Sequence, residues 1–392
     1  MRNQLSVAAL LAASGLLLAT LSLASNSETE DSAPLQLTLE DLQTFTLVFD
    51  QIRRHYVEEI SETRLLQAAI DGMLMETDGN SLFLDPSQSR ESRSKMAGKE
   101  VGISAEINVV NGRLILGEVL PGSSAYSAGL RSGDVITAVD DVPVRGRLIT
   151  DSLAAIRGKL GTEVSLTLAR SGHRLENILV RREWAPMRSV DSQWFDPGVA
   201  YFSISHFHDL TDEEFSARAD ALMEAQSAPL QGVILDLRHN GGGSIRAAVQ
   251  VADEFLEHGP IVSTNSRYPA TQMKFTANPG QKFPGTRVAL LLNGETASAA
   301  ELLAAALQDR GRARLFGQKS FGKGSIQTVH DLPNGSSLKI TTARYITPSG
   351  HGVDAEGVEP DVPVSSEKDP LEVAASWLLE GFDFPNKRRS SN

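Results

Sequence analysis

The chain contains no cysteine among its 392 residues, which excludes disulfide bonds, thiolate nucleophiles and cysteine-ligated metal sites. It also lacks an excess of positive charge, because 49 acidic residues outnumber 37 basic ones and leave a formal net charge of −12. That balance argues against electrostatically driven binding to nucleic acid. Aromatic residues make up only 6%, yet a hydrophobic content of 41% and a charged content of 22% are ordinary for a globular protein. The length is ample for two or three packed units.

Long hydrophobic runs are absent except at the N-terminus. Arg2 precedes an uncharged run from Leu5 to Ala24, which ends in the small-x-small cleavage signal Ser22-Leu23-Ala24 and is followed by polar and acidic residues. We therefore expect a signal peptide at residues 1–24. Export of an acidic protein without cysteine points to a bacterial periplasm. Because the run is long for a signal peptide, an uncleaved membrane anchor is the alternative.

A serine and a lysine further along the chain suit nucleophilic catalysis. Ser298 precedes the Ala-rich segment Ala299 to Gln308, whose residues favour a helix, and Lys323 follows 25 positions later. A serine hydroxyl becomes a good nucleophile when a base removes its proton, and a neutral lysine amine is one such base. An exposed lysine has a pKa of about 10.4, which burial lowers by up to about 3–5 units. This pair predicts a serine hydrolase with an amine base.

The residues around the lysine fit that role. Gly322 and Gly324 add no side-chain bulk, and we expect Phe321 and Ile326 to form an apolar wall beside the amine. Gln327, four residues after the lysine, is placed to hold the amine by a hydrogen bond. The segment therefore predicts both a low-dielectric setting for the base and a group that orients it.

Two backbone segments are candidates for an oxyanion hole. The first amides of a helix have no partner within the helix, so the Ala299 N–H is a natural donor to a developing negative charge. The strand-like run Gly232 to Leu237 leads to three successive glycines, Gly241 to Gly243, which let the backbone approach a substrate closely. A merely flexible glycine turn is the alternative interpretation.

Four motifs in this order make the chain resemble the C-terminal processing peptidases, also called tail-specific proteases. The family's motifs are D-L-R-x-N-G-G-G, G-S-A-S-A-S-E, F-G-K-G-x-x-Q and T-T-A-R-Y-x-T-P-S-G. They correspond here to Asp236 to Gly243, Glu295 to Glu301, Phe321 to Gln327 and Thr341 to Gly350. The resemblance implies that Ser298 is the nucleophile, Lys323 the base and Gln327 its orienting residue. It further implies an oxyanion hole of Ala299 N–H with Gly242 or Gly243.

Some positions depart from the family pattern. Thr296 and Ala300 stand where the family has flanking serines, and His239 stands where asparagine is common. In the N-terminal region the family's D-P-H-S appears as Asp78-Gly79-Asn80-Ser81, a loop far in sequence from the chemistry. These differences bear on the surroundings of the site and leave the nucleophile and base in place.

Residues 97–182 resemble a PDZ domain. The signature P-G-S-x-A-x-x-A-G-L-x-x-G-D-x-I runs from Pro121 to Ile136. A PDZ domain binds an extended peptide as an added strand and captures its terminal carboxylate with loop amides. The resemblance assigns this task to Val101, Gly102, Ile103, Ser104 and Ala105, with Ile103 donating hydrogen bonds along the edge. A PDZ domain that serves only as a lid is the alternative.

Periodicity divides the rest of the mature chain. Leu42, Phe45, Phe49, Ile52 and Tyr56 share one helical face, so a helical pair is expected before residue 75, as a cap, a dimerisation arm or a pair packed on the body. We expect Asp85-Pro86-Ser87 to close this pair.

Alternating strands and helices from residue 199 onward predict an α/β fold, and the resemblance implies a ClpP/crotonase-like serine protease core with an inserted, β-rich PDZ domain. The expected organisation is an N-terminal helical region at 38–90, the PDZ domain at 97–182, the peptidase core at 183–366, and a C-terminal helix and tail at 367–392.

Within the core, individual elements follow from the local pattern. We expect strands at 199–204, 233–237, 261–263 and 288–292, helices at 211–226, 246–257 and 371–379, and a variable loop at 264–286.

Two other functions stay open. A Ser–His hydrolase is one, since His206, His208 and His239 lie near the expected site, and a catalytically silent PDZ adaptor is the other. The pair His206 and His208 is a weak metal signal without a further ligand, so no metal or cofactor is expected. The resemblance implies protein or peptide substrates with free C-termini. It leaves open an adaptor or activator protein and a homodimer.

Overall fold

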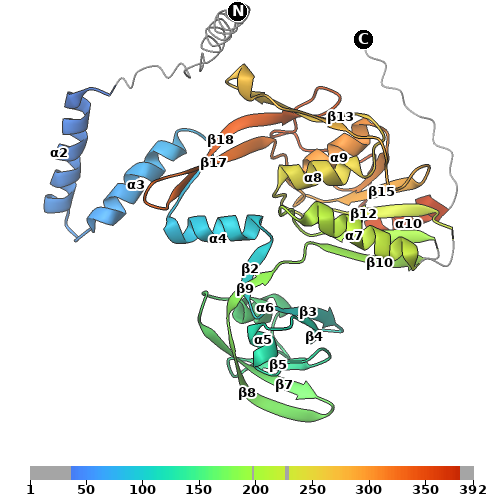
Figure 1. Cartoon of the computed structure of the whole chain (residues 1–392). Coiled ribbons are helices and arrows are strands. Elements are labelled where there is room, and N and C mark those ends of the chain that lie inside the picture. The colour runs from blue at the N-terminus through green and yellow to red at the C-terminus, as the bar shows by residue number, and fades with distance from the viewer. Residues whose placement is uncertain (1–36, 197, 226–228, 380–392) are drawn as a thin grey trace, which may run out of the picture. The chain divides into compact units, whose positions relative to one another are not determined.

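The computed structural model describes residues 37–196, 198–225 and 229–379 (Figure 1). The chain divides into two units, residues 1–72 and residues 73–392. The expected signal peptide at 1–24 and the basic tail after residue 379 lie outside the described residues.

The first unit consists of the expected helices. Helix α2 (Leu39–His55) starts at a capping box in which the Thr38 Oγ1 accepts from the Asp41 amide at 3.1 Å and the Asp41 carboxylate accepts from the Thr38 amide at 2.9 Å. Helix α3 (Glu62–Met75) follows and runs past the division at residue 72. No residue of α2 is buried, so its apolar face is left uncovered.

The second unit opens with elements that the sequence interpretation did not include. Asp85-Pro86-Ser87 was expected to close the helical pair, but it begins a further helix, α4 (Pro86–Met96). Asp85 caps this helix by accepting from the Ser87 and Gln88 amides at 2.7 and 2.9 Å. Asp at the N-cap and Pro at the first helical position are signals of a helix start. The residues of α4 are mostly polar, however, so the helix lacks the periodic apolar side chains by which it could have been predicted. Before α4, strand β1 (Leu82–Leu84) pairs with β18 (Ser337–Ile346).

A separate antiparallel sheet and its own core make up the region that resembles a PDZ domain. Buried side chains such as Leu114, Leu166 and Val180 form this core. Strand β3 is at one edge of the sheet and β8 at the other. The second helix of this region begins at Ile149. The elements are β3 (Ala105–Val110), β4 (Arg113–Val119), α5 (Ser124–Ser127), β5 (Val135–Val139), β6 (Val142–Pro143), α6 (Ile149–Ile156), β7 (Glu163–Arg170) and β8 (His173–Arg181).

The expected peptide-binding loop is shorter than predicted. Val101 and Gly102 lie in strand β2 (Lys99–Gly102), which pairs with β9 (Glu183–Pro186), so their backbone is already committed to a sheet. Ala105 begins β3. Only Ile103 and Ser104 connect the two strands, with the Ile103 side chain buried in the PDZ core and Ser104 at a φ of 54°. The loop is short because pairing with the distant strand β9 already engages Val101 and Gly102.

A six-stranded sheet forms the peptidase region, and its strand order is β10-β11-β12-β15-β16-β19. All neighbours pair in parallel except β10 with β11. Successive residues point to opposite faces: Val233 and Leu235 face the core shared with α7 to α9, while Ile234 faces α10. The sheet is therefore covered on both sides, as its nearly continuous apolar strands require. The elements are β10 (Val190–Asp196), β11 (Val199–Ile204), α7 (Thr211–Glu224), β12 (Gly232–Asp236), α8 (Ile245–Asp253), β15 (Arg287–Leu292), α9 (Ala299–Asp309), β16 (Ala313–Gly317), β19 (Val362–Pro363) and α10 (Pro370–Leu379).

Two expectations for this region need correction. Helix α8 ends at Asp253, four residues before the expected Glu257, because the chain turns there to bury Phe255 and Leu256. The expected loop at 264–286 contains strand β14 (Lys274–Ala277), which forms a hairpin with β13 (Gly259–Ser266), with a short 3-10 turn (Pro269–Thr271) between them. The expected helix at 371–379 is present as α10, and it packs on the main sheet through Ala374, Ala375 and Leu378.

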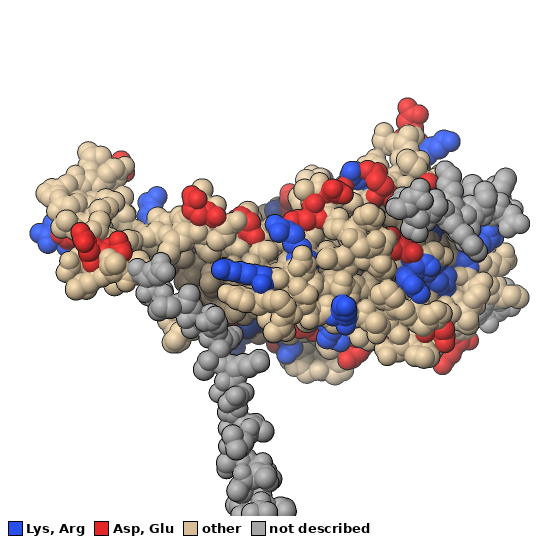
Figure 2. All heavy atoms as spheres, turned by 90° about the horizontal axis from the view of Figure 1, so that it is seen from above, with Lys and Arg blue, Asp and Glu red and all other residues tan. Residues whose placement is uncertain are grey.

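A second sheet carries the segment after Lys323. Strand β17 (Ser325–Asp331) and the long strand β18 form an antiparallel hairpin, and β18 also pairs with β13 and β1 (Figure 1). On the face in Figure 2, Lys and Arg side chains are interspersed with Asp and Glu, so this face carries no continuous basic field.

Candidate active site

Ser298 sits at the tight turn between β15 and α9. Its backbone has φ 57° and ψ −118°, a conformation that is costly for a residue with a side chain and that persists only when the surroundings enforce it. Helix α9 begins at the next residue, Ala299, and is buried along most of its length. The serine is thus held at the mouth of a helix whose first amides are free of helical partners.

The glycine loop lies directly against this turn. A Cβ atom at Gly242 would lie 2.8 Å from Ser298 Cβ and 2.9 Å from the Ala299 nitrogen, so only glycine permits the approach. The Gly242 N–H donates to Asn240 Oδ1 at 2.8 Å, and the Asn240 carbonyl accepts from Ala297 N at 2.9 Å. At Gly243, whose φ is 134°, a Cβ would lie 1.9 Å from the Phe207 carbonyl oxygen. The structure thus brings Ala299 and Gly242 together at the serine, with Gly243 next along the loop.

The Glu301 carboxylate joins the serine turn to the lysine segment. It is completely buried. Its Oε2 accepts from both the Ser298 amide and the Lys323 amide, each at 2.8 Å. Its Oε1 accepts from the Gly322 amide at 2.7 Å and from the Ser320 hydroxyl. Because one oxygen atom receives both amides, Ser298 and Lys323 are neighbours in space despite their separation in sequence.

Tyr345 makes a second bridge between the same residues. Its hydroxyl lies 3.3 Å from the Ser298 carbonyl oxygen and 3.2 Å from that of Lys323, with geometry to donate to either. The ring is 2% exposed. Burial and the charges of Glu301 and Asp354 raise the pKa of Tyr345, so its hydroxyl keeps its proton and acts as a donor. Backbone N–H and C=O groups of both segments are thus held from opposite sides.

The Lys323 side chain is half-buried, and its surroundings differ partly from expectation. Ile326 is buried as expected, but Phe321 is 68% exposed and does not wall the amine. Phe321 is turned outward because its own amide is tied to the Thr296 carbonyl at 3.0 Å. Gln327 donates from Nε2 to Ser325 Oγ at 2.9 Å and to Thr341 Oγ1 at 3.2 Å. The Gln327 amide therefore lies in a polar cross-strand cluster with Ser325 and Thr341.

Charged groups also approach this segment from neighbouring elements. Burial and, to a lesser degree, the charge of Lys323 lower the pKa of Lys339 on β18. The Asp354 carboxylate accepts from the Gly324 amide at 3.2 Å and pairs with Arg344 at 2.7 Å. A Cβ at Gly324 would lie 2.6 Å from the Asp354 amide nitrogen, so the glycine is needed for this approach.

The D-L-R motif anchors the glycine loop. Asp236, at the end of β12, accepts from Arg238 Nη2 at 2.7 Å and from the Tyr201 hydroxyl at 2.9 Å. Burial and the charge of Asp236 raise the pKa of Tyr201. Arg238 also reaches Asp369 at 3.2 Å, just before α10. The motif therefore fixes the direction in which the chain leaves the strand toward Asn240.

The three histidines weighed as alternative bases each have local partners. His239 Nδ1 lies 3.0 Å from Glu295 Oε2 on the surface. His208 is 3% exposed, and its two ring nitrogens contact the Leu210 amide at 3.1 Å and the Met187 carbonyl at 3.0 Å. His206 Nδ1 lies 2.9 Å from Ser205 Oγ, and burial lowers the pKa of His206. No contact between these rings and Ser298 is seen among the described residues.

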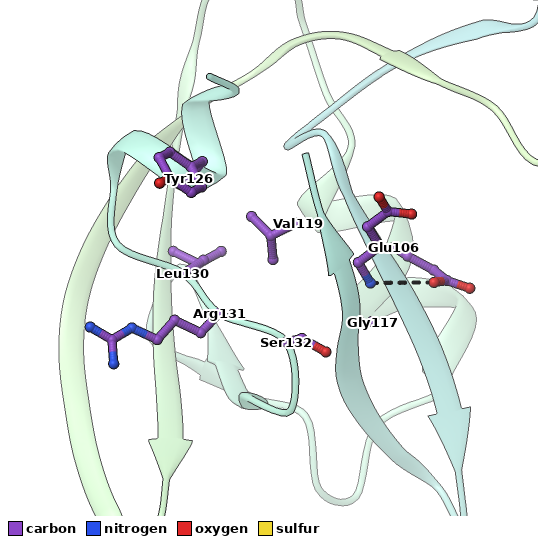
Figure 3. A pocket seen from close by; sticks show the side chains of 8 residues that line it. Glu106, Gly117, Val119, Tyr126, Leu130, Arg131 and Ser132 are labelled. Carbon is purple, nitrogen blue, oxygen red and sulfur yellow. Dashed lines mark hydrogen bonds between the residues drawn. The ribbon is translucent and has the colours of Figure 1, made fainter. Parts of the chain in front are cut away.

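The PDZ region contains a cavity of its own of about 710 Å³. Figure 3 shows Tyr126, Leu130 and Val119 around it, with Arg131 and Glu106 at its margins. None of the predicted catalytic residues lines this cavity. Within the part of the chain that the structure describes, no group of three or more acidic or histidine side chains is arranged to hold a metal ion, and no helix is long and apolar enough to cross a membrane.

Glu301 and Tyr345 were not predicted as site residues, although both contact the Ser298 and Lys323 segments. Glu301 closes a family motif, and a glutamate three residues after an N-cap position is the spacing of a capping box, which was a usable signal. Tyr345 gave no such local signal, because its partners are brought near only by the β-sheet.

Known proteins share this architecture. Residues 198–364 match the model of peptidase family S41, and residues 115–170 match that of the PDZ domain. The chain is 33% identical over 334 residues to a "Carboxy-terminal-processing protease" of Bartonella bacilliformis, covering 84% of this chain and 76% of that one. It is also 33% identical to a "Probable CtpA-like serine protease" of Staphylococcus aureus, covering 82% of this chain but only 64% of the relative.

A solved structure supports the fold. A Bacteroides fragilis protein classed with the S41 proteases aligns with a TM-score of 0.50 at 15% identity, covering 86% of this chain and 98% of that one. The expected fold, a serine protease core with a PDZ domain, is confirmed. The chain therefore belongs to the carboxy-terminal-processing proteases of peptidase family S41, and it is a serine-type peptidase.

Proposed function

We propose that this peptidase uses a Ser298–Lys323 dyad to cleave exported proteins that it recognises by their free C-terminal tails. One observation carries the proposal. The Ser298 and Lys323 amides donate to the same Glu301 oxygen at 2.8 Å, so the nucleophile and the base start from adjacent backbone positions.

In the proposed reaction the Lys323 amine takes the Ser298 hydroxyl proton as the serine oxygen attacks a peptide carbonyl carbon. The resulting ammonium then gives that proton to the leaving amine, and the acyl-enzyme forms. Water, deprotonated by the same amine, attacks the ester carbonyl, and the ammonium then returns this proton to the departing Ser298 oxygen as the second product is released. Gln327 orients the amine throughout.

The oxyanion would bind at the helix mouth. The Ala299 N–H is the first donor. Because the Gly242 N–H already donates to Asn240 Oδ1, we assign the second donor to the Gly243 N–H. The close fit between Gly242 and Ser298 supports this position for the loop.

Tail recognition is assigned to the PDZ domain. Strand β3 is at the edge of its sheet, so an extended peptide can pair with it as a further strand. Ile103, Ser104 and Ala105 remain the proposed carboxylate end of that site. A partner adaptor or activator and a homodimer remain hypotheses.

Export is part of the proposal. Residues 1–24 have the composition of a signal peptide. Fractionation of cells expressing the full chain, with N-terminal sequencing of the product, tests this. A mature protein that begins near residue 25 in the periplasm is expected, and a product retained in the cytoplasm with an intact N-terminus would contradict export.

The dyad is tested with an unfolded model protein bearing a free or an amidated C-terminus. Ser298→Ala and Lys323→Ala should each lower cleavage by at least about a thousandfold. Lys319→Ala removes a half-exposed lysine that pairs with Glu359, and it is the matched control with unchanged cleavage. Full activity of Lys323→Ala would refute the dyad, and equal cleavage of both substrates would refute recognition of the free tail.

A Ser–His mechanism predicts different results. Histidine-to-alanine changes at 206, 208 and 239 should leave cleavage of the unfolded substrate within a few-fold of wild type if lysine is the base. Histidine would be favoured instead if any one of these variants lost as much activity as Ser298→Ala. The wild-type pH–rate profile would then show a limb near about 6–7.

A further inference from the structure

A chain of hydrogen bonds leads from Asp78 through Thr341 to Gln327. We propose that the Asp78 carboxylate, acting through the Thr341 hydroxyl, fixes the orientation of the Gln327 amide and so presents its Oε1 atom to the Lys323 amine. The inference rests on the proposed function, in which Lys323 is the base. Asp78 and Thr341 are positioning residues, since both act through Gln327.

The strand geometry fixes the surroundings of the Gln327 side chain. Ser325 and Gln327 alternate along β17, which begins two residues after Lys323, so their side chains share a face. Thr341 is the cross-strand partner of Gln327 in the β17–β18 hairpin (Figure 1). Gln327 Nε2 donates to Thr341 Oγ1 across this pair and to Ser325 Oγ along its own strand.

The loop before β1 reaches the same point from the other side of β18. Leu82 pairs with Lys339, so the antiparallel chain brings residues 78–81 alongside Thr341. The Ser81 hydroxyl oxygen accepts from the Thr341 amide at 3.2 Å. Asp78 Oδ1 accepts from the Asn80 and Ser81 amides at 2.8 and 2.6 Å, and the carboxylate also bonds the Thr341 hydroxyl.

The direction of each bond follows from the carboxylate. An ionised carboxylate only accepts, so the single proton of the Thr341 hydroxyl must go to Asp78. The Thr341 oxygen is then an acceptor, which requires the NH₂ end of the Gln327 amide to face it. The Oε1 end is left for the lysine.

That orientation matters for a base. An amide oxygen accepts a hydrogen from the neutral amine and leaves the nitrogen lone pair for the serine proton. The reversed amide would donate to this lone pair and compete with the serine. Amide orientations are decided by such networks of partners.

The carboxylate stays ionised at any pH at which the enzyme would work. Burial alone would raise the pKa of Asp78, but the hydrogen bonds from Thr341, Asn80 and Ser81 outweigh it and lower that pKa to about 2.

The test uses the full chain and two readouts, cleavage of the unfolded model protein and the rate at which a fluorophosphonate labels Ser298. Asp78→Asn replaces the carboxylate acceptor by an amide whose NH₂ group can donate to the Thr341 oxygen. The Thr341 hydroxyl proton would then point away from residue 78. Thr341→Val removes the hydroxyl at nearly constant volume, and Thr341→Ser keeps it. Each change at the relay should lower kcat and the labelling rate about tenfold or more, with KM within about twofold.

Asp85→Asn is the matched control. Asp85 also accepts from two backbone amides two and three residues ahead, but it caps α4 and has no contact with Thr341. Asp85→Asn and Thr341→Ser should retain wild-type kcat. The double variant Asp78→Asn/Thr341→Val should be no slower than either single variant, because both break one chain.

The results that would overturn the relay differ from the result that would refute the dyad. Three results would each overturn the relay. The first is a fall in kcat in Asp78→Asn no larger than in Asp85→Asn, and the second is a double variant whose losses of kcat add. The third is wild-type kcat in Thr341→Val. If Asp78→Asn does not fold, the comparison of Thr341→Val with Thr341→Ser decides alone. Unimpaired cleavage by Lys323→Ala would instead refute the proposed dyad, whatever the relay variants do.

Discussion

The peptidase core and the PDZ domain each contain a buried carboxylate, but the two are held differently. Glu301 in the core receives donors that carry no net charge, three of them backbone amides from the serine and lysine segments. Asp134 in the PDZ domain, whose side chain is 1% exposed, pairs with the Arg170 guanidinium at 2.7 Å. Backbone donors position chain segments, whereas an ion pair connects side chains. The difference indicates that the core carboxylate organises a site and the PDZ carboxylate stabilises a fold.

Glu301→Gln should have the largest effect. The new NH₂ group faces donors instead of acceptors, so either the Ser298 and Lys323 amides or the Gly322 amide and Ser320 hydroxyl lose their partner. We expect a loss of stability of about 2–4 kcal/mol and a fall in kcat of at least about a hundredfold. Urea unfolding and cleavage assays measure both, with the exposed Glu359→Gln as control. A folded variant with wild-type kcat would show that the bridge does not serve catalysis.

Tyr345→Phe tests the opposite side of the same bridge. The ring stays in the core, but the Ser298 and Lys323 carbonyls lose the hydroxyl donor. A loss of about 1–2 kcal/mol and a fall in kcat of about tenfold are expected. Tyr268→Phe changes an exposed tyrosine and is the control. Loss of stability without any change in kcat would reduce Tyr345 to a packing residue.

Asp134→Asn should affect the other region in a different way. The PDZ domain should lose about 1–3 kcal/mol at neutral pH, with faster hydrogen exchange in β5 and β7. KM for the free-tail substrate should rise, while fluorophosphonate labelling of Ser298 should not slow. Slower labelling would contradict the separation of the two roles.

The loss of stability in Asp134→Asn should depend on pH, and the direction of this dependence follows from the pKa of Asp134. Burial raises the pKa of Asp134, but the hydrogen bond and charge of Arg170 outweigh it, so the folded-state pKa is lowered. Its contribution to stability is therefore present above the unfolded value of about 3.9 and is lost as the pH falls through the folded value. The difference in stability between wild type and Asp134→Asn should shrink as the pH falls below about 3.9, and a difference that stays constant through the acid range would contradict this origin.

Lys339→Met should give the smallest effect. Burial and, to a lesser degree, the charge of Lys323 lower the pKa of Lys339, so its ammonium is unfavourably placed. Replacing it by an apolar side chain of similar length should raise stability at neutral pH by less than about 1 kcal/mol, measured by urea unfolding. Lys319→Met is the control. A loss of stability in Lys339→Met alone would show that the ammonium is favourably placed.

Local sequence was informative wherever a residue and its partner lie close along the chain. The start of α9, the apolar strands of the main sheet and the PDZ turn signature could all be predicted, and the family was correctly recognised from four motifs. The hairpin at 259–277 and helix α4 could not, because the first depends on pairing with β18 and the second has no apolar period.

The sequence by itself determined which chemical groups are available: a serine at a helix mouth, a lysine between glycines, a glycine-rich loop and no thiol. Only the tertiary structure decided their arrangement. The Glu301 oxygen that receives two distant amides, the Tyr345 hydroxyl opposite it and the Asp78 loop beside Thr341 all depend on strand pairing across up to 260 residues. Hydrogen bonds act over about 3 Å, so partners that are far apart in the chain cannot be identified until the sheet brings them together.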